Sequence, residues 1–197
     1  MPAIEGQIPI NVKNTNDPEK KGTMIVPASQ IHRKSKITGI ASSDKFSALF
    51  IHSYLVNRQV GFSLKVLQIL ADLNISYEHM PSGIDDITII FAKDQLTNGR
   101  KEQLTQRVKD EIKPDTLEWK NDYSIIMVVG EGLVNRVGAI AGIVDPLKDK
   151  GISLTMVNQG SSEISIMLGV RPSEEKKAVE AIYDANFKDG KPIVKNQ

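Results

Sequence analysis

The chain contains one structural unit twice, and this duplication constrains the fold more than any other feature of the sequence. The string LVNRQVG, which ends at Gly61, recurs as LVNRVG, which ends at Gly138, 77 positions further on. At the same spacing and without a gap, ILADLNISYEHMPSGIDDITII matches PLKDKGISLTMVNQGSSEISIM. A short match can arise by chance, but a register held over this length indicates a repeated supersecondary unit.

Both copies predict the same order of elements. A β-rich segment (46–55 and 123–132) leads through a glycine-ended loop into a helix with apolar residues on one face. Two short strands then form a hairpin around a glycine-containing turn, and a second helix follows (99–112 and 173–187). The predicted fold class is therefore α+β, with two ferredoxin-like βαββαβ domains in tandem, each an antiparallel sheet with its helices on one face.

The repeat also predicts the domain organisation. The first domain is expected over residues 37–120 and the second over 121–197, while residues 1–36 belong to neither copy. The segments 37–42, 116–120 and 192–195 are candidate end strands, and their pairing stays open because strands can be exchanged between the copies. Domains of fewer than about 100 residues bury a modest share of their surface, so we expect an oligomer.

Composition excludes several classes of function. The 25 Lys and Arg residues balance 24 Asp and Glu residues, so neither nucleic acid nor a membrane surface is an expected partner. There is no cysteine, which excludes disulfides and thiolate metal sites and fits a cytoplasmic location. The apolar runs are far shorter than the roughly 20 residues of a membrane helix. His32, His52 and His79 lack metal-ligand spacing, so no metal site is expected.

The duplicated pattern resembles the tandem ACT domains of aspartokinases. NISYEHMPSGIDDITII is similar to the first of these domains, and VVGEGLVNRVG and QGSSEISI are similar to the second. IPINVKNTNDP followed by GTMI resembles the last stretch of the family's catalytic domain. The resemblance implies a regulatory module that binds an amino-acid effector and takes part in feedback inhibition of the aspartate pathway.

The same resemblance implies that the chain is no enzyme on its own. The Lys-Phe-Gly-Gly motif with which family catalytic domains open is absent, as is any Walker-type phosphate loop, so no catalytic residue is expected. No cofactor is expected either, because ATP and Mg would serve only the full-length kinase. The expected partners are a free amino acid, a second copy paired through the ACT domains, and a catalytic aspartokinase chain or domain.

The residues themselves suggest where a free amino acid would bind. Unpaired N–H groups at a helix N-terminus favour an anion, and Gly61 would let a ligand carboxylate approach the helix that begins at Phe62 and Ser63. We expect the strand after that helix to lie beside the first strand, which would bring Glu78 near the same loop, within one subunit or across a paired one. A hydrogen bond from the ligand ammonium to Glu78 would contribute about 1.5–3 kcal/mol.

The resemblance to lysine-sensitive aspartokinases extends this site. It implies L-lysine at an ACT–ACT interface, although Gln59 and Ser63 depart from the lysine-sensitive pattern; threonine binding, or assembly without a ligand, are the alternatives. The second copy has Thr155 in place of Glu78 and is expected to bind less well, contributing across the interface instead. The predicted site comprises Val56, Asn57, Gln59, Gly61, Phe62, Ser63, Ser76, Tyr77, Glu78, Ser82, Gly83, Ser153 and Leu154.

Structural explanations compete with several of these assignments. Gly61 and Gly138 are also explained as turn glycines, and Phe62 as a core residue. Glu78 is also explained as a solvated strand residue. Asp85 and Asp86 lie in a tight turn, where Asp is favoured for backbone reasons.

Overall fold

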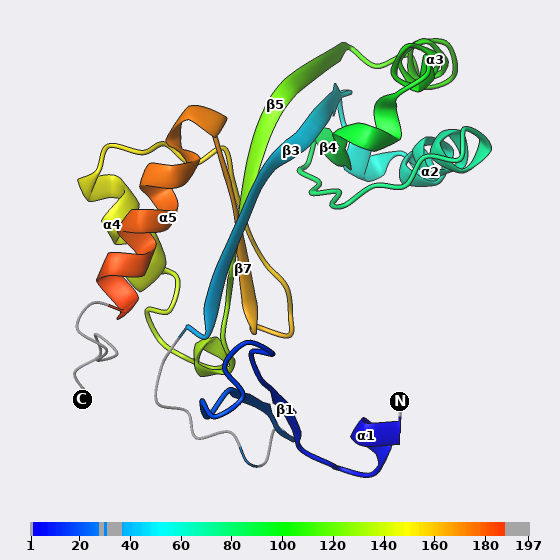
Figure 1. Ribbon diagram of the computed structural model, residues 1–197. Helices are drawn as coiled ribbons and strands as arrows, with labels where there is room; N and C mark the ends of the chain where they lie inside the picture. The colour runs from blue at the N-terminus through cyan, green and yellow to red at the C-terminus, as the bar shows by residue number, and fades with distance from the viewer. Residues whose placement is uncertain (1, 28–29, 31–36, 188–197) are drawn as a thin grey trace. The chain divides into compact units, whose positions relative to one another are not determined.

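The fold is described from a computed structural model that covers residues 2–27, 30 and 37–187 (Figure 1). The chain divides into two units, residues 1–34 and 35–197. The candidate end strand at 192–195 and the side chain of His32 lie outside the described residues. The two units are described separately.

The first unit is small and built around a hairpin. Helix α1 (Pro2–Glu5) precedes strands β1 (Ile10–Val12) and β2 (Thr23–Ile25), which pair antiparallel, and every residue of both strands is exposed. The polar stretch KNTNDPEKKG, residues 13–22, connects the two strands. Gly22 has a φ of +71°, and a side chain there would collide with the carbonyl oxygen of Val12, so the loop requires glycine at this position.

The second unit contains a five-stranded antiparallel sheet with the order β4-β3-β5-β7-β6. The two central strands are long: β3 (Gly39–His52) and β5 (Thr116–Val129) each have 14 residues. The outer strands are β4 (Asp86–Ala92) on one side, and β7 (Ser165–Val170) and β6 (Met156–Gln159) on the other.

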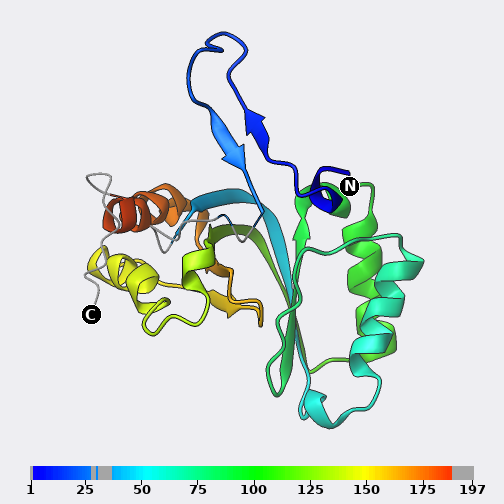
Figure 2. The same ribbon diagram turned by 90° about the horizontal axis from the view of Figure 1, so that it is seen from below.

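Two pairs of helices cover different parts of this sheet (Figure 2). Helix α2 (Phe62–Asp72) lies beside α3 (Arg100–Arg107), which continues as a π-helix over Val108–Ile112. Helix α4 (Ala141–Asp149) packs against α5 (Pro172–Phe187). Short 3-10 turns occur at Val56–Arg58, Lys93–Leu96 and Glu131–Leu133. We call the part around α2, α3 and β4 the first half, and the part around α4, α5, β6 and β7 the second half.

The long strands explain how the two copies of the repeat are joined. Residues 46–52 of β3 pair with β4 in the first half, whereas residues 39–43 of the same strand pair with the end of β5 in the second half. Conversely, residues 116–120 of β5 belong to the first half and residues 124–129 pair with β7. The segments 37–42 and 116–120, whose pairing the sequence left open, are thus end strands of the second and first half respectively.

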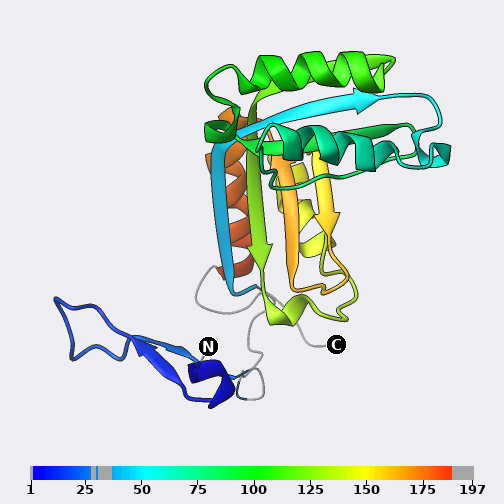
Figure 3. The same cartoon turned by 90° about the vertical axis from the view of Figure 1, so that its right-hand side faces the viewer.

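Each half has its own core between sheet and helices. Ile89 and Val66 are fully buried in the first core, and Ile126 and Ile182 in the second. A third cluster, made by Ala48, Ile90, Tyr123 and Ile125, joins the halves. There, β3 and β5 shift register between Ser43 and Ala48, and Figure 3 shows both strands bending where the halves meet. Such irregularities bend a strand locally, so the sheet turns a corner here.

The second strand expected in the first copy is less regular than predicted. The stretch 75–82, which we call the edge segment, forms only two isolated bridges, His79 with Ile90 and Ser82 with Ile87. Our expectation that it lies beside the first strand is wrong: it lies outside β4, where the N–H of Glu78 donates to the Ile90 carbonyl at 2.8 Å. The ferredoxin-like sheet places the third strand, here β4, between the first and second strands.

Candidate functional site

The loop that follows the first strand is held by the hairpin turn of its own half. We call residues 53–61 the first glycine loop. Leu55 adopts a left-handed conformation with a φ of 57°, and its N–H donates to the Asp85 carboxylate at 2.8 Å. The Ser53 N–H donates to the Asp85 carbonyl at 3.0 Å, and the Asn57 N–H to the Ile84 carbonyl at 3.1 Å. Asp85 therefore has the backbone role that its position in a tight turn suggested.

Gly61 ends this loop and precedes helix α2. Its φ is +81°, and a Cβ built on it would meet nothing within 4 Å, so the backbone conformation rather than crowding favours glycine. The Phe62 N–H donates to the Gln59 carbonyl at 3.2 Å. Within the part of the chain that the structure describes, the N–H groups of Ser63 and Leu64 have no acceptor. These two groups are main-chain donors at the start of α2 that are available to an anion.

Three other residues of the predicted site, in this loop or directly after it, differ in whether their side chains are buried or exposed. The side chains of Val56 and Phe62 are buried in the first core, so neither presents its side chain to a ligand at the loop surface. The side chain of Gln59 is exposed and donates to the Tyr54 carbonyl at 3.1 Å. The ligand-facing part of this loop is therefore mainly backbone.

Ser76, Tyr77 and Glu78 lie at the opposite end of the first half. They follow α2, an 11-residue helix that is about 16 Å long at about 1.5 Å per residue and begins at the glycine loop. The three residues are exposed, and the Ser76 N–H donates to the Gln95 side chain at 3.4 Å. Within one chain, the glycine loop and these residues do not form one site, which corrects our expectation for a single subunit.

The other end of the edge segment does reach the glycine loop. β4 begins at Asp86, opposite His52, the last residue of β3. Ser82 pairs with Ile87, and the Gly83 N–H donates to the Asp86 carbonyl at 2.9 Å. Ser82 and Gly83 are exposed at the end of the sheet from which the glycine loop departs.

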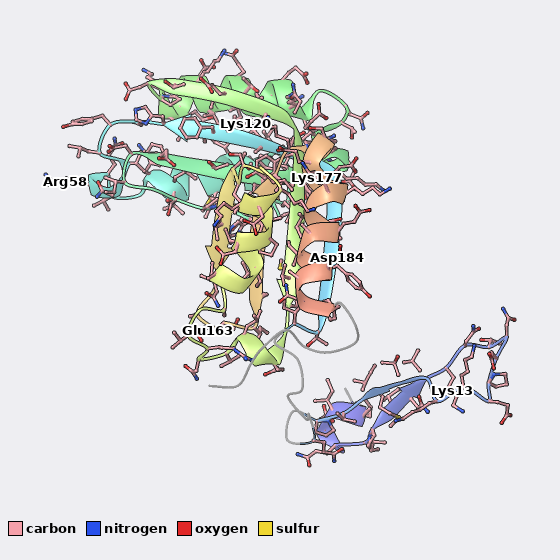
Figure 4. The ribbon with its side chains drawn as sticks, turned by 90° about the vertical axis from the view of Figure 1, so that its left-hand side faces the viewer. Lys13, Arg58, Lys120, Glu163, Lys177 and Asp184 are labelled. Atoms are coloured by element: carbon pink, nitrogen blue, oxygen red, sulfur yellow. The ribbon has the colours of Figure 1, made fainter. Side chains whose placement is uncertain are left out.

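The second half repeats this construction with different groups. Gly138 has a φ of +73°, and the Asn135 N–H donates to the Glu163 carboxylate at 2.6 Å. Figure 4 shows Glu163 at the far end of the second half from Arg58 in the first glycine loop. Ser153 is exposed, and Leu154 packs against the second core.

Exposed apolar side chains surround the first glycine loop, a feature that our sequence reasoning missed. Val60, immediately before Gly61, is fully exposed, and so is Val137 before Gly138. Tyr54, Leu64 and Ile84 are also largely exposed near the first loop. The sequence does contain a signal for this feature, since an apolar residue directly precedes each glycine of the repeat. Grouped exposed apolar side chains are typical of interaction surfaces.

Burial shifts the pKa values of the half-buried His79 and the buried Tyr123. Burial lowers the pKa of the His79 imidazole below its ordinary value of 6.5, and its Nε2 atom has no hydrogen-bond partner among the described residues. Burial also raises the pKa of the Tyr123 phenol, against the opposing effect of a hydrogen bond with Thr155.

The described ranges contain neither a metal-ligand cluster nor a helix that could span a membrane. No three His, Asp or Glu side chains there gather in a metal-binding arrangement. None of the helices combines the length and the apolar character needed to cross a bilayer.

The repeated ferredoxin-like halves, each with a glycine-led helix entry, have the fold of tandem ACT domains. Residues 126–185 match the family model described as ACT domain. Over 187 residues the chain is 38% identical to aspartokinase 3 of Bacillus subtilis, a match that covers 95% of this chain and 41% of that enzyme. Nearly the whole chain is therefore similar to part of an aspartokinase, and it spans about two fifths of that relative's length.

Solved structures agree with this assignment. The aspartate kinase of Clostridium acetobutylicum superposes with a TM-score of 0.89 at 34% identity, covering 93% of this chain and 42% of that one. Escherichia coli aspartokinase III, in complex with lysine and aspartate, superposes with a TM-score of 0.76 at 18% identity, covering 95% of this chain and 41% of that one. At the lower identity, the likeness shows the fold alone.

Proposed function

We propose that this chain is the effector-sensing module of an aspartokinase and that it binds L-lysine between the first halves of two paired copies. The observation that carries the proposal is the separation within one chain: the glycine loop and Ser76–Glu78 lie at opposite ends of the same half. A site that uses both is complete only when a second copy is present.

Antiparallel pairing of two edge segments would bring the separated parts together. The edge segment is paired with β4 on one side, and in antiparallel pairing its start lies opposite the end of the partner's segment. Ser76, Tyr77 and Glu78 of one copy would then lie near Ser82 and Gly83 of the other, next to the partner's glycine loop. The exposed Val60 and Leu64 would lie close to this contact and lose water there.

The groups at such an interface match a free amino acid. The N–H groups of Ser63 and Leu64 would bind the carboxylate, because a helix N-terminus favours an anion. The exposed Glu78 carboxylate would accept a hydrogen bond from the α-ammonium group of the ligand. The second half has Thr155, whose hydroxyl already bonds the Tyr123 hydroxyl at 3.0 Å. For this reason, Ser153 and Leu154 are assigned a supporting role at the interface.

Lysine is the proposed effector because the first copy resembles that of lysine-sensitive aspartokinases, and because the structurally similar E. coli enzyme has been solved with lysine. Lysine regulates the kinase in this proposal only if it binds one arrangement of subunits better than another; a coupling of about 1–3 kcal/mol is typical. Phosphoryl transfer itself is assigned to a kinase region.

Calorimetric titration tests the proposal directly. L-lysine should bind the wild-type chain and raise the dimer fraction measured by sedimentation. Glu78→Gln should weaken binding by about 10- to 150-fold, the equivalent of about 1.5–3 kcal/mol. Glu102→Gln is the matched control, since Glu102 is exposed on α3 and has no side-chain partner in the described part of the chain.

Three outcomes would count against parts of the proposal. Binding of threonine with no response to lysine would reassign the effector. Lysine binding that Glu78→Gln weakens, in a chain that stays monomeric, would refute the paired site. Dimerisation without any response to lysine or threonine would favour an assembly role alone.

A further inference from the structure

A pocket lies on the sheet face opposite the helices, in the corner where the two halves meet. Its volume is about 290 Å³. β3 and β4 of the first half supply its floor, and Tyr123, Thr155 and Met156 of the second half form its wall. We call it the corner pocket. No residue of the first glycine loop lines it, whereas Ser82 and Gly83 of the proposed interface site do.

Two opposite charges line this pocket without meeting each other. The Asp86 carboxylate comes from the start of β4, and the Lys120 ammonium from β5. Neither side chain has a hydrogen bond or ion pair with any residue that the structure describes. Asp86 is half-buried, and its carboxylate lies so close to Gly83 that a Cβ there would come within 2.8 Å of Oδ2.

The strand register fixes how far apart the charges are. Asp86 pairs with His52 on one side of β3, and Lys120 pairs with Ala48 on the other side. Four residues along a strand and two strand spacings place their Cα atoms about 16 Å apart. Even if both side chains extend toward each other, several ångströms remain between the carboxylate and the ammonium group. Phe50 lies on β3 midway between these two positions and lines the pocket.

The second half adds directional hydrogen-bonding groups. The hydroxyls of Thr155 and Tyr123 bond each other at 3.0 Å, which uses one of their two protons and leaves one for a ligand. Gly169 makes room for this pair, because a Cβ there would collide with the Tyr123 hydroxyl oxygen. Thr88, which pairs with Phe50, adds a hydroxyl at the floor.

We infer that the corner pocket binds a small linear zwitterion, which lies over the Phe50 ring with its carboxylate at Lys120 and its terminal ammonium at Asp86. A single α-ammonium beside a carboxylate is too compact to reach both charges. An aliphatic chain between the two ionic ends would cover Phe50 and Met156. This site is complete within one chain and uses neither Glu78 nor the first glycine loop.

Titration of the whole chain with 6-aminohexanoate tests this site, because the probe lacks the α-ammonium assigned to Glu78. It should bind with one site per chain. Asp86→Asn and Lys120→Met should each weaken its binding about tenfold or more, since each removes one charge-assisted contact. Asp145→Asn and Lys109→Met are matched controls on exposed helical positions and should bind as the wild type does.

Further variants separate this site from the interface and from misfolding. Glu78→Gln should leave 6-aminohexanoate affinity unchanged, so the two proposals can fail independently. Asp86→Glu keeps the charge and should retain binding within about threefold. This variant distinguishes the loss of a charge from a disturbed structure at the start of β4. Wild-type chain that does not bind 6-aminohexanoate, or binding unaffected by both Asp86→Asn and Lys120→Met, would overturn the inference.

Discussion

The two halves share the construction of the glycine loop and differ at the segment that would face a ligand. In both, a turn carboxylate accepts a hydrogen bond from a loop N–H: Asp85 from Leu55 at 2.8 Å, and Glu163 from Asn135 at 2.6 Å. In the first half, however, Glu78 is exposed and has no side-chain partner among the described residues. The position matching Glu78 in the second half is Thr155, which bonds Tyr123. The repeat thus maintains the loop scaffold while the side chain available to a ligand changes.

A second difference concerns regularity at the sheet edge. The second half ends in β6, a regular strand of four residues, whereas the edge segment of the first half forms only isolated bridges. Fewer ladder hydrogen bonds hold the first edge, so it is the better candidate for pairing with another chain.

The largest expected effect tests whether the halves are energetically independent. Ile89→Ala in the first core and Ile126→Ala in the second should each destabilise the chain by about 2–5 kcal/mol, because both side chains are fully buried. Since β3 and β5 run through both halves, each variant should lower a single unfolding transition of residues 35–197. Two separated calorimetric transitions, only one of them shifted, would show that the halves unfold separately.

A smaller effect should distinguish the two glycine loops. Asp85→Ala and Glu163→Ala should each cost about 1.5–3 kcal/mol for a hydrogen bond to a charged acceptor. The loss should be larger at Asp85, because it holds a leucine in the left-handed conformation, whereas Asn135 tolerates that conformation better. Denaturant unfolding measures both.

Asp85→Asn offers a control, since its amide oxygen still accepts the bond. Equal losses in Asp85→Ala and Glu163→Ala would mean that the strain at Leu55 contributes little.

The smallest expected effect is a pH dependence of stability that originates from a residue of the first half. The pKa of His79 is lowered in the folded chain, while an unfolded chain has the ordinary value of 6.5. As pH falls below 6.5, the unfolded state binds the proton first, so stability is full above that pH and is lost as pH falls toward the folded pKa. The matching residue of the second half is Met156, which does not titrate.

Denaturant midpoints measured from pH 8 to pH 5 should show this loss in the wild type and a smaller loss in His79→Gln. An unchanged pH profile in His79→Gln would assign the dependence to other groups.

Much of the architecture could be predicted from the sequence because it depends on local periodicity. The helix over Phe62–Asp72 and the return strands over Asp86–Ala92 and Ser165–Val170 agree with their apolar spacing. Gly61 and Gly138, for which a turn was one of the explanations from the sequence, both have a positive φ. The core position of Phe62 was one of two readings that the sequence left open.

The sequence by itself determined the repeated unit, its helices and most of its strands, since these follow from the order of residues along the chain. Only the tertiary structure decided which strands pair. It joined residues 39–43 to the second half, placed Glu78 outside β4, and brought Asp86 and Lys120 to one pocket. Pairing partners lie far apart in sequence, and residues of a strand alternate in the same way whichever neighbour they bond. For that reason, strand pattern identifies a strand but does not identify its partner.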